Sequence, residues 1–209
     1  AIAQQGPRGF YQGEVAADIV ATLRARGGLL AAEDFAAHRG EPATPIATTY
    51  RGLDVVELPP NGQGLAALVL LNILERFDMR ALDPAGAERF HIALEAARLA
   101  YAVRDTHIAD PSYMQVPAPL LLARRFAADL AAKIDRSRKV AMPKAPMPRG
   151  DTVLGTVVDR DRMAVSIINS LFNSFGTGIA TEKTGVLLHN RGSGFVVEPG
   201  HPNCIGPRK

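Results

Sequence analysis

Thr152 is the hydroxyl-bearing residue whose position most suggests chemistry. It opens a β-branched, strand-like run directly after a proline-studded, basic stretch that ends at Gly150-Asp151. A second hydroxyl, that of Ser170, lies near the end of the following apolar run. Hydroxyl side chains of this kind act as nucleophiles when a base lies beside them. A lone threonine is nevertheless a weak motif, so the spacing has to be examined first.

A β-hairpin would bring these two hydroxyls together. The polar run at 159–162 is the natural turn between two strand-like segments, 152–159 and 163–171. If the loop is centred on Asp161, Val158 faces Ala164 and Thr152 faces Ser170. Cross-strand Thr/Ser pairs are also an ordinary stabilising feature of sheets, and spacing alone favours that structural interpretation.

Other residue types that carry chemistry have plainer interpretations. His91 and His107 have Asp105 and Asp110 near them, but the spacing of a metal-binding His-Glu-x-x-His motif is absent, so we expect capping or core residues. The single Cys204 excludes an intrachain disulfide and a cysteine zinc site. The sequence therefore predicts no metal site.

Residues around the second hydroxyl also have structural alternatives. Gly176 and Gly178 are expected in a tight turn, because the Lys-Ser/Thr of a phosphate-binding loop is missing. Asp159 and Asp161 are turn residues by default. His189 could line a pocket with its neighbours or be a buried strand-end histidine satisfied by the backbone, and the sequence leaves both open.

The composition limits the class of protein. The 209 residues are 47% apolar and 22% charged with a net charge of +3, which is typical of a globular protein in water. The longest apolar run, 65–71, is far shorter than the roughly 20 residues that a membrane span needs. A basic segment at 136–149 lacks interleaved aromatic residues, so we predict no nucleic-acid partner. The compartment stays open.

The elements that must position the candidate residues follow from periodicity. The first half predicts helices with one hairpin between them, and the remainder after residue 152 is predicted to be mostly strand. The long helix is expected to start at Asp83-Pro84, as N-cap and first-turn proline. The first predicted helices run through Val15, Ile19 and Leu23 up to Gly27-Gly28, over 33–38, and, as a buried helix, after Gly62 and Gly64. Two later helices run through Phe90, Leu94, Ala97 and Tyr101, and through Leu122, Phe126, Leu130 and Ile134. The predicted hairpin joins 45–50 to 53–58.

Several long runs of the sequence are similar to one known family. The run "GDTVLGTVVDRDRMAVSIINSLFNSFGTGI", followed by "TGVLLHNRGSGF" and "PGHPNCIGP", resembles the start of the small subunit in the gamma-glutamyltranspeptidase family. Upstream, "GFYQGEVAADIVATLRARGGLLAAEDFAAH", "YRGLDVVELPPNGQG" and "LERFD" resemble the later part of its large subunit. The segment "HNRGSGF" is more similar to the cephalosporin-acylase-like branch.

The resemblance implies an N-terminal nucleophile hydrolase of α/β (α+β) class, part of a four-layer αββα sandwich. Such a protein cuts itself between Asp151 and Thr152, and Thr152 becomes the catalytic nucleophile. Its new α-amino group, with a pKa of about 7.7 to 8.0, can accept the hydroxyl proton as general base. Ser170 matches the family's hydroxyl that orients the nucleophile. No metal or organic cofactor is implied.

On the substrate side the sequence departs from the family. The acidic residue that holds the α-amino group of a γ-glutamyl substrate corresponds here to Gly194, an asparagine corresponds to Phe172, and a glutamine corresponds to Arg191. Asn190 lies beside Arg191 and is expected to line the pocket. A guanidinium binds carboxylate and repels ammonium, so we predict a small-molecule amide with a glutaryl-like or other carboxyl-bearing acyl group. The γ-glutamyl amides that the family resemblance implies are the other acyl class. Alternatively, Arg191 forms a structural ion pair.

The implied organisation is a large-subunit part at 1–151, ending in an exposed linker at about 136–151, and the start of a small subunit at 152–209. The two subunits are expected to pair after cleavage, with water or an amine as acyl acceptor. The family's oxyanion-hole glycines and paired serines come later than Lys209, and its carboxylate-binding arginine comes before Ala1. We therefore expect a chain cut from something longer. The alternative function is a non-catalytic, uncleaved fragment of such an enzyme.

Overall fold

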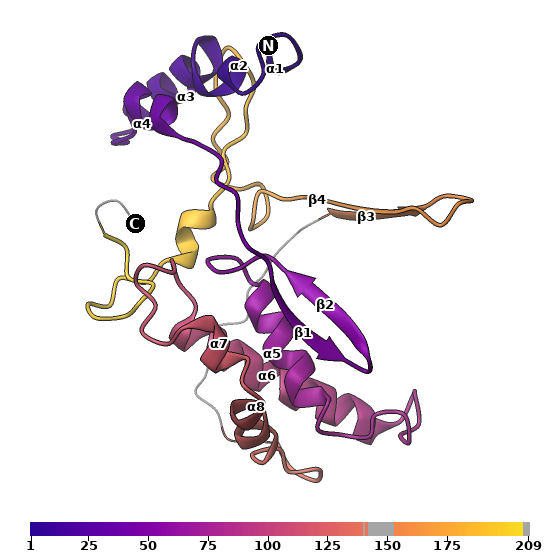
Figure 1. Cartoon of the computed structure of the whole chain (residues 1–209). Helices are drawn as coiled ribbons and strands as arrows, with labels where there is room; N and C mark the ends of the chain where they lie inside the picture. Colours follow the sequence, from indigo (N-terminus) through magenta and orange to yellow (C-terminus); the bar gives the residue numbers. More distant parts are fainter. Residues whose placement is uncertain (140, 142–152, 207–209) are drawn as a thin grey trace. The chain divides into compact units, whose positions relative to one another are not determined.

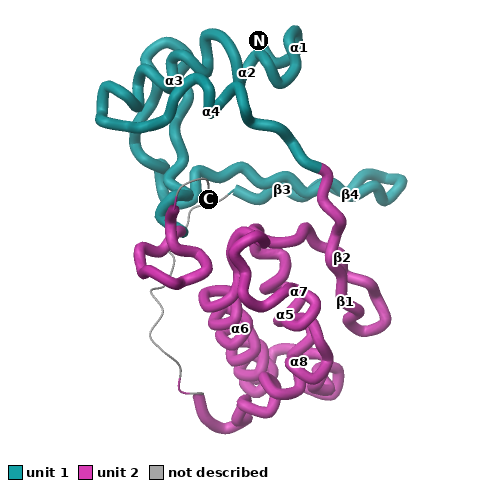
Figure 2. The backbone as a smooth tube through the Cα atoms, turned by 60° about the vertical axis from the view of Figure 1, so that its left-hand side comes forward, with its two compact units in different colours: residues 1–41, 145–194 teal, residues 42–144, 195–209 magenta. Residues whose placement is uncertain are grey.

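The computed structural model describes residues 1–139, 141 and 153–206. The chain divides into two compact units, each formed by two separate stretches of sequence (Figure 2): residues 1–41 with 145–194, and residues 42–144 with 195–209. Helices and antiparallel hairpins occur in the same chain, which is the α+β class that the sequence predicts. The described part of the chain has no helix long and apolar enough to cross a membrane.

In the described residues of the first unit there are four helices, one hairpin and one 3-10 turn (Figure 1). In chain order these are α1 (Ile2–Gln5), α2 (Arg8–Tyr11), α3 (Glu14–Arg24), α4 (Ala32–Ala37), β3 (Val153–Val158), β4 (Ala164–Asn169) and η1 (Arg191–Gly194).

Helix α3 is the amphipathic helix that the spacing of Val15, Ile19 and Leu23 predicts. Of these three residues, Ile19 is buried. After the helix, Gly27 has a φ of 80°, and the Gly28 amide donates to the Leu23 carbonyl at 2.9 Å. A glycine in the left-handed region is the usual end of a helix, so this part of the prediction is confirmed.

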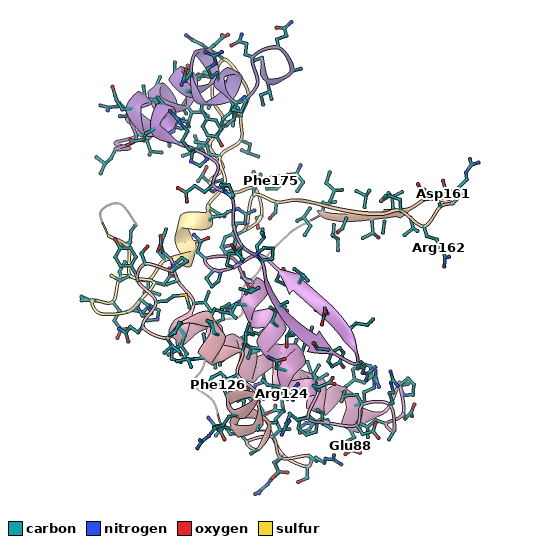
Figure 3. The ribbon with its side chains drawn as sticks, in the orientation of Figure 1. Glu88, Arg124, Phe126, Asp161, Arg162 and Phe175 are labelled. Atoms are coloured by element: carbon teal, nitrogen blue, oxygen red, sulfur yellow. The ribbon has the colours of Figure 1, made fainter. Side chains whose placement is uncertain are left out.

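Strands β3 and β4 pair in the predicted register. Val158 faces Ala164, and the ladder continues to Val153 opposite Asn169. At the turn, one carboxylate oxygen of Asp159 accepts hydrogen bonds from the amides of Asp161 and Met163, each at 2.9 Å. Figure 3 shows Asp161 and Arg162 at the tip of this hairpin. The prediction that Asp159 and Asp161 are turn residues is confirmed.

The prediction of strand beyond the hairpin is wrong for most of residues 170–206. In the described part of this stretch, extended pairing is limited to two isolated bridges, Ala180 with Leu187 and Val196 with Cys204. The rest consists of turns, bends and η1. Side-chain-to-backbone hydrogen bonds replace ladder bonds here, as polar residues in loops allow.

The second unit packs a hairpin and a buried helix against other helices. Its elements are β1 (Ile46–Tyr50), β2 (Leu53–Glu57), α5 (Gly64–Leu74), α6 (Ala87–His107), α7 (Ala118–Leu121) and α8 (Arg124–Ala131). β1 and β2 pair antiparallel, with Tyr50 opposite Leu53, as predicted. Helix α5 supplies the fully buried side chains Leu65, Leu68 and Ile73 of the core.

Helix α6 differs from its prediction at its start and in its buried face. It begins at Ala87, because Asp83 caps a preceding turn by accepting from the Ala85 amide at 3.0 Å. The predicted stripe is largely exposed: Phe90, Leu94 and Tyr101 are 58%, 63% and 52% exposed. The buried stripe is Ile92, Ala96, Leu99 and Val103, which has the same helical spacing.

Candidate active site

The predicted nucleophile and cleavage site, Thr152 and Asp151, lie outside the described residues. Strand β3 begins at the next residue, Val153, whose partner on β4 is Asn169. Ser170 directly follows that partner. The other predicted site residues lie in two segments of the first unit, 170–176 and 189–194.

Ser170 starts a tight turn at the end of β4. Its hydroxyl oxygen accepts a hydrogen bond from the amide of Phe172 at 3.0 Å. Phe172 has a φ of 84°, a backbone conformation that is rare for a bulky residue. Strained conformations of this kind cost about 1–3 kcal/mol and cluster at functional sites. The turn holds Ser170 and Phe172 in a fixed relation two residues apart.

Arg191 contacts both of these residues. Its guanidinium donates to the carbonyl oxygen of Ser170 at 2.8 Å, and its central carbon lies 5.9 Å from the centre of the Phe172 ring. Among the described residues, Arg191 forms no ion pair with a carboxylate. A guanidinium has five N–H donors, so this arrangement leaves capacity for an anionic ligand. The ion-pair alternative therefore has no partner in the described part of the chain.

Asn190 binds the protein backbone. Its side-chain amide donates to the carbonyls of Asn173 at 3.3 Å and Gly176 at 3.0 Å, and its side-chain oxygen accepts from the Asn173 amide at 3.0 Å. These three bonds join the loop after Ser170 to the segment that carries Arg191. The side chain thus has a structural task in addition to any contact with a substrate.

Gly194 ends the 3-10 turn η1 that Arg191 begins. A Cβ atom built on Gly194 would meet no atom within 4 Å. The space for a side chain is therefore present, and the lack of an acidic group here is not imposed by crowding. The nearby His189 ring accepts a hydrogen bond from the Arg191 amide at 3.2 Å, so it has a backbone partner. The residue is exposed and lies outside any strand, so the prediction of a buried strand-end histidine is wrong.

The remaining candidates behave as structural residues. Gly176 and Gly178 have φ values of 64° and 69° in the turn that was predicted for them. The His91 ring contacts the Asp135 carbonyl at 2.8 Å. Within the residues that the structure describes, no group of three or more His, Cys, Asp or Glu side chains is arranged to hold a metal ion.

One functional candidate was missed by sequence reasoning. Asp18 is buried on α3, and one of its carboxylate oxygens accepts from the Lys183 amide at 3.0 Å and from the Thr184 amide and hydroxyl at 2.7 and 2.8 Å. Burial opposes ionisation, but these donors outweigh it and hold the pKa of Asp18 below its ordinary value. The available signal was an aspartate between the apolar residues Ala16 and Ile19.

Comparison with known proteins identifies the family to which this chain belongs. The family model described as gamma-glutamyltranspeptidase matches residues 1–209. The chain belongs to the gamma-glutamyltranspeptidase family. It is 40% identical over its whole length to the glutathione hydrolase-like YwrD proenzyme of Bacillus subtilis, and 33% identical over its whole length to the oxamate amidohydrolase proenzyme of Klebsiella pneumoniae. It covers 39% of each of these relatives.

Two solved structures are similar to this chain in fold. The cephalosporin acylase from Bacillus halodurans matches 99% of the chain, with 34% identity and a TM-score of 0.84, and the chain covers 37% of that structure. The gamma-glutamyltranspeptidase of Helicobacter pylori matches 64% of the chain, with 32% identity, a TM-score of 0.59 and 39% of that structure covered. The predicted family and the N-terminal nucleophile hydrolase fold are confirmed.

The relatives also bear on maturation and on length. Those named above from Bacillus subtilis and Klebsiella pneumoniae are proenzymes, which agrees with an enzyme family whose members are processed. The chain spans about two fifths of the length of these relatives.

Proposed function

We propose that the protein is an amidohydrolase or acyltransferase that cuts itself between Asp151 and Thr152 and then acts through an acyl-threonine. The substrate is an amide with a carboxyl-bearing, glutaryl-like acyl group, and γ-glutamyl amides are the competing substrate class. Water or an amine accepts the acyl group. The pieces 1–151 and 152–209 belong to the large and small subunits, which stay paired after the cut.

The nucleophile assignment is supported by the hairpin register and by the family. The observed pairing of Val158 with Ala164 is the relation from which the Thr152–Ser170 pairing is predicted. In the proposed mechanism the Thr152 hydroxyl attacks the amide carbonyl, its own α-amino group accepts the proton, and Ser170 orients the hydroxyl. The α-ammonium group gives this proton to the nitrogen of the leaving amine, and water, whose proton the α-amino group accepts, then hydrolyses the acyl-threonine ester and restores the Thr152 hydroxyl.

The observation that carries the acyl specificity is the setting of Arg191. The guanidinium is held by the Ser170 carbonyl and lies over the Phe172 ring, so it is fixed next to the residue proposed to orient the nucleophile. A fixed guanidinium without a carboxylate partner in the described chain suits a substrate carboxylate. Oxamate, in the name of one relative, also combines an amide with a carboxylate.

The first test compares two anilides in the full-length protein that contains this sequence. We expect glutaryl anilide to be hydrolysed with a higher kcat/KM than γ-glutamyl anilide. Arg191→Gln should lower kcat/KM for the glutaryl substrate by about 10- to 100-fold, which is the usual loss for a hydrogen bond to a charged group. Arg160→Gln, at the exposed hairpin turn, is the control. Equal rates on both anilides, or an inert Arg191→Gln change, would contradict the proposed acyl class.

The second test restores the missing acid. Because Gly194 has open space around its Cβ position, Gly194→Asp should be accommodated and should raise kcat/KM for γ-glutamyl anilide relative to glutaryl anilide. Gly192→Asp is the matched control, since it adds the same charge to the same turn and also meets no atom within 4 Å. If Gly194→Asp and Gly192→Asp change the preference between the two anilides equally, the cause is a general charge effect. That result would count against the assignment of Gly194 to the substrate site.

A further inference from the structure

The contact between Asp18 and residues 183–184 joins two parts of the sequence 166 residues apart. A buried carboxylate is costly unless donors surround it. Here two backbone amides and one hydroxyl converge on the same oxygen, at 2.7 to 3.0 Å. In Figure 1 the loop that contains this turn runs up to helix α3, which carries Asp18. This is a specific polar contact within the first unit.

The receiving turn is closed by its own hydrogen bonds. The Thr181 and Thr184 hydroxyls lie 2.8 Å apart, and the Val186 amide donates to the Thr181 hydroxyl oxygen at 2.9 Å. The Thr181 amide donates in turn to the Val186 carbonyl at 3.0 Å. Fixing Thr184 therefore fixes the whole turn 181–186.

From this turn, two loop segments lead back to the candidate active site, and hydrogen bonds join them to each other. Ala180 bridges to Leu187, the Leu188 amide donates to the Ile179 carbonyl, and the Thr177 amide donates to the Leu188 carbonyl, the last two at 2.9 Å. We call this pair of segments, residues 173–190, the arm. Its base is closed by the side chain of Asn190, and Arg191 follows directly.

We propose that Asp18 is a positioning residue that anchors the tip of the arm and thereby holds Arg191 at the substrate site. The inference rests on the proposed function in one respect. With a cut before Thr152, Asp18 and the arm would be on different polypeptides, so the contact would be a noncovalent link between the large-subunit and small-subunit parts. A residue from the large-subunit part would then control the acyl-binding residue of the small-subunit part.

The experiment uses the full-length protein and two ways of breaking the anchor, Asp18→Asn and Thr184→Val. Thr184→Ser retains the hydroxyl and is the conservative rescue, and Glu182→Gln removes an exposed carboxylate from the same turn as a control. Readouts are self-cleavage, kcat and KM for glutaryl anilide, and hydrogen–deuterium exchange of peptides covering 181–191. If one of the two anchor variants fails to fold, the other still tests the proposal.

We expect both anchor variants to cleave normally and to exchange faster from the turn through to residues 188–191. KM should rise about tenfold with kcat nearly unchanged, as expected when an interaction that binds ground state and transition state equally is lost. Thr184→Ser and Glu182→Gln should resemble the wild type. Faster exchange limited to 181–186, or unchanged KM in both anchor variants, would overturn the proposal.

Failure of the proposed function is distinguishable from failure of this inference. If the wild-type protein neither cleaves nor hydrolyses either anilide, the function is wrong, and the exchange data alone decide the role of Asp18. Faster exchange at 188–191 in both anchor variants would then still support the anchor, and unchanged exchange there would overturn it.

Discussion

At the residue scale, the loop after Ser170 is held in an uncommon conformation by a few specific contacts. Phe172 and Ser174 have positive φ values of 84° and 45°, and Gly176 and Gly178 lie in the same region. Such a backbone is maintained only where the surroundings determine it strongly. The Ser170 hydroxyl and the Asn190 side chain hold the loop in this conformation through their hydrogen bonds to its backbone.

Gly176 should be far less tolerant of substitution than Gly178. Both have positive φ, but a Cβ on Gly176 would lie 2.3 Å from the Leu188 carbonyl oxygen, whereas one on Gly178 would meet nothing within 4 Å. Gly178→Ala should cost about 1–2 kcal/mol for the left-handed backbone alone. Gly176→Ala should cost clearly more, because backbone must move. Urea unfolding of the two variants checks this, and equal losses would contradict the described packing.

The side chain of Asn190 should be needed as an amide. In Asn190→Asp, a carboxylate oxygen would face the Asn173 and Gly176 carbonyls in place of the donor. Loss of these bonds should lower the free energy of unfolding by about 2 kcal/mol at neutral pH. Asn169→Asp, on the exposed strand β4, is the matched control and should change little. If both substitutions cost the same in chemical denaturation, Asn190 does not clamp the loop.

The family resemblance pointed to Ser170, Phe172, Asn190 and Arg191 as site residues, and their roles stay a prediction. In the structure, Arg191 donates to the Ser170 carbonyl, the Ser170 hydroxyl accepts from the Phe172 amide, and Asn190 bonds the adjoining loop backbone. The sequence could not assign the three hydrogen bonds of the Asn190 side chain, because an amide can bond to a substrate or to the protein backbone equally well. That choice depends on tertiary contacts, and so does the pairing of Asp18 with a turn 166 residues away.

At the scale of elements, local patterns predicted the helices and hairpins better than their faces. α6 carries two apolar stripes with helical spacing, and only packing against α5 and α8 decides which one is buried. After β4, the apolar residues suggested strands, whereas threonine and asparagine side chains form hydrogen bonds with the backbone instead. Competition from such local bonds is invisible to a periodicity argument.

The contact of α3 with the turn 181–186 should depend on pH. The pKa of Asp18 is lower in the folded protein than its unfolded value of about 3.9, so the carboxylate stabilises the fold above that value, and the contribution is lost as pH falls through the folded pKa. We expect the stability difference between wild type and Asp18→Asn to be constant from about pH 5.5 to 7 and to shrink below about pH 4.

Urea unfolding at a series of pH values measures this difference. Glu182→Gln, which removes an exposed carboxylate next to the same contact, should show little difference from wild type at any pH. A gap between wild type and Asp18→Asn that grows on acidification would have the wrong sign for a hydrogen-bonded carboxylate. It would contradict the role of Asp18 as an ionised anchor.

At the scale of the whole molecule, the family and the α+β class were predicted from motif order along the chain, and the comparisons confirm both. The two compact units were not predicted, because each combines stretches that are far apart in sequence. The division into a large-subunit part at 1–151 and a small-subunit part at 152–209 describes a cut in the chain, which is a different property from compactness. It stays a prediction.

The most direct test of the account is the mass and N-terminal sequence of the purified full-length protein and of its Thr152→Ala variant. We predict two polypeptides for the wild type, the second beginning with Thr152, and one uncut polypeptide without amidase activity for the variant. A Thr152→Ala protein that still matures and still hydrolyses its substrate would contradict the central claim that this threonine supplies both the nucleophile and its base.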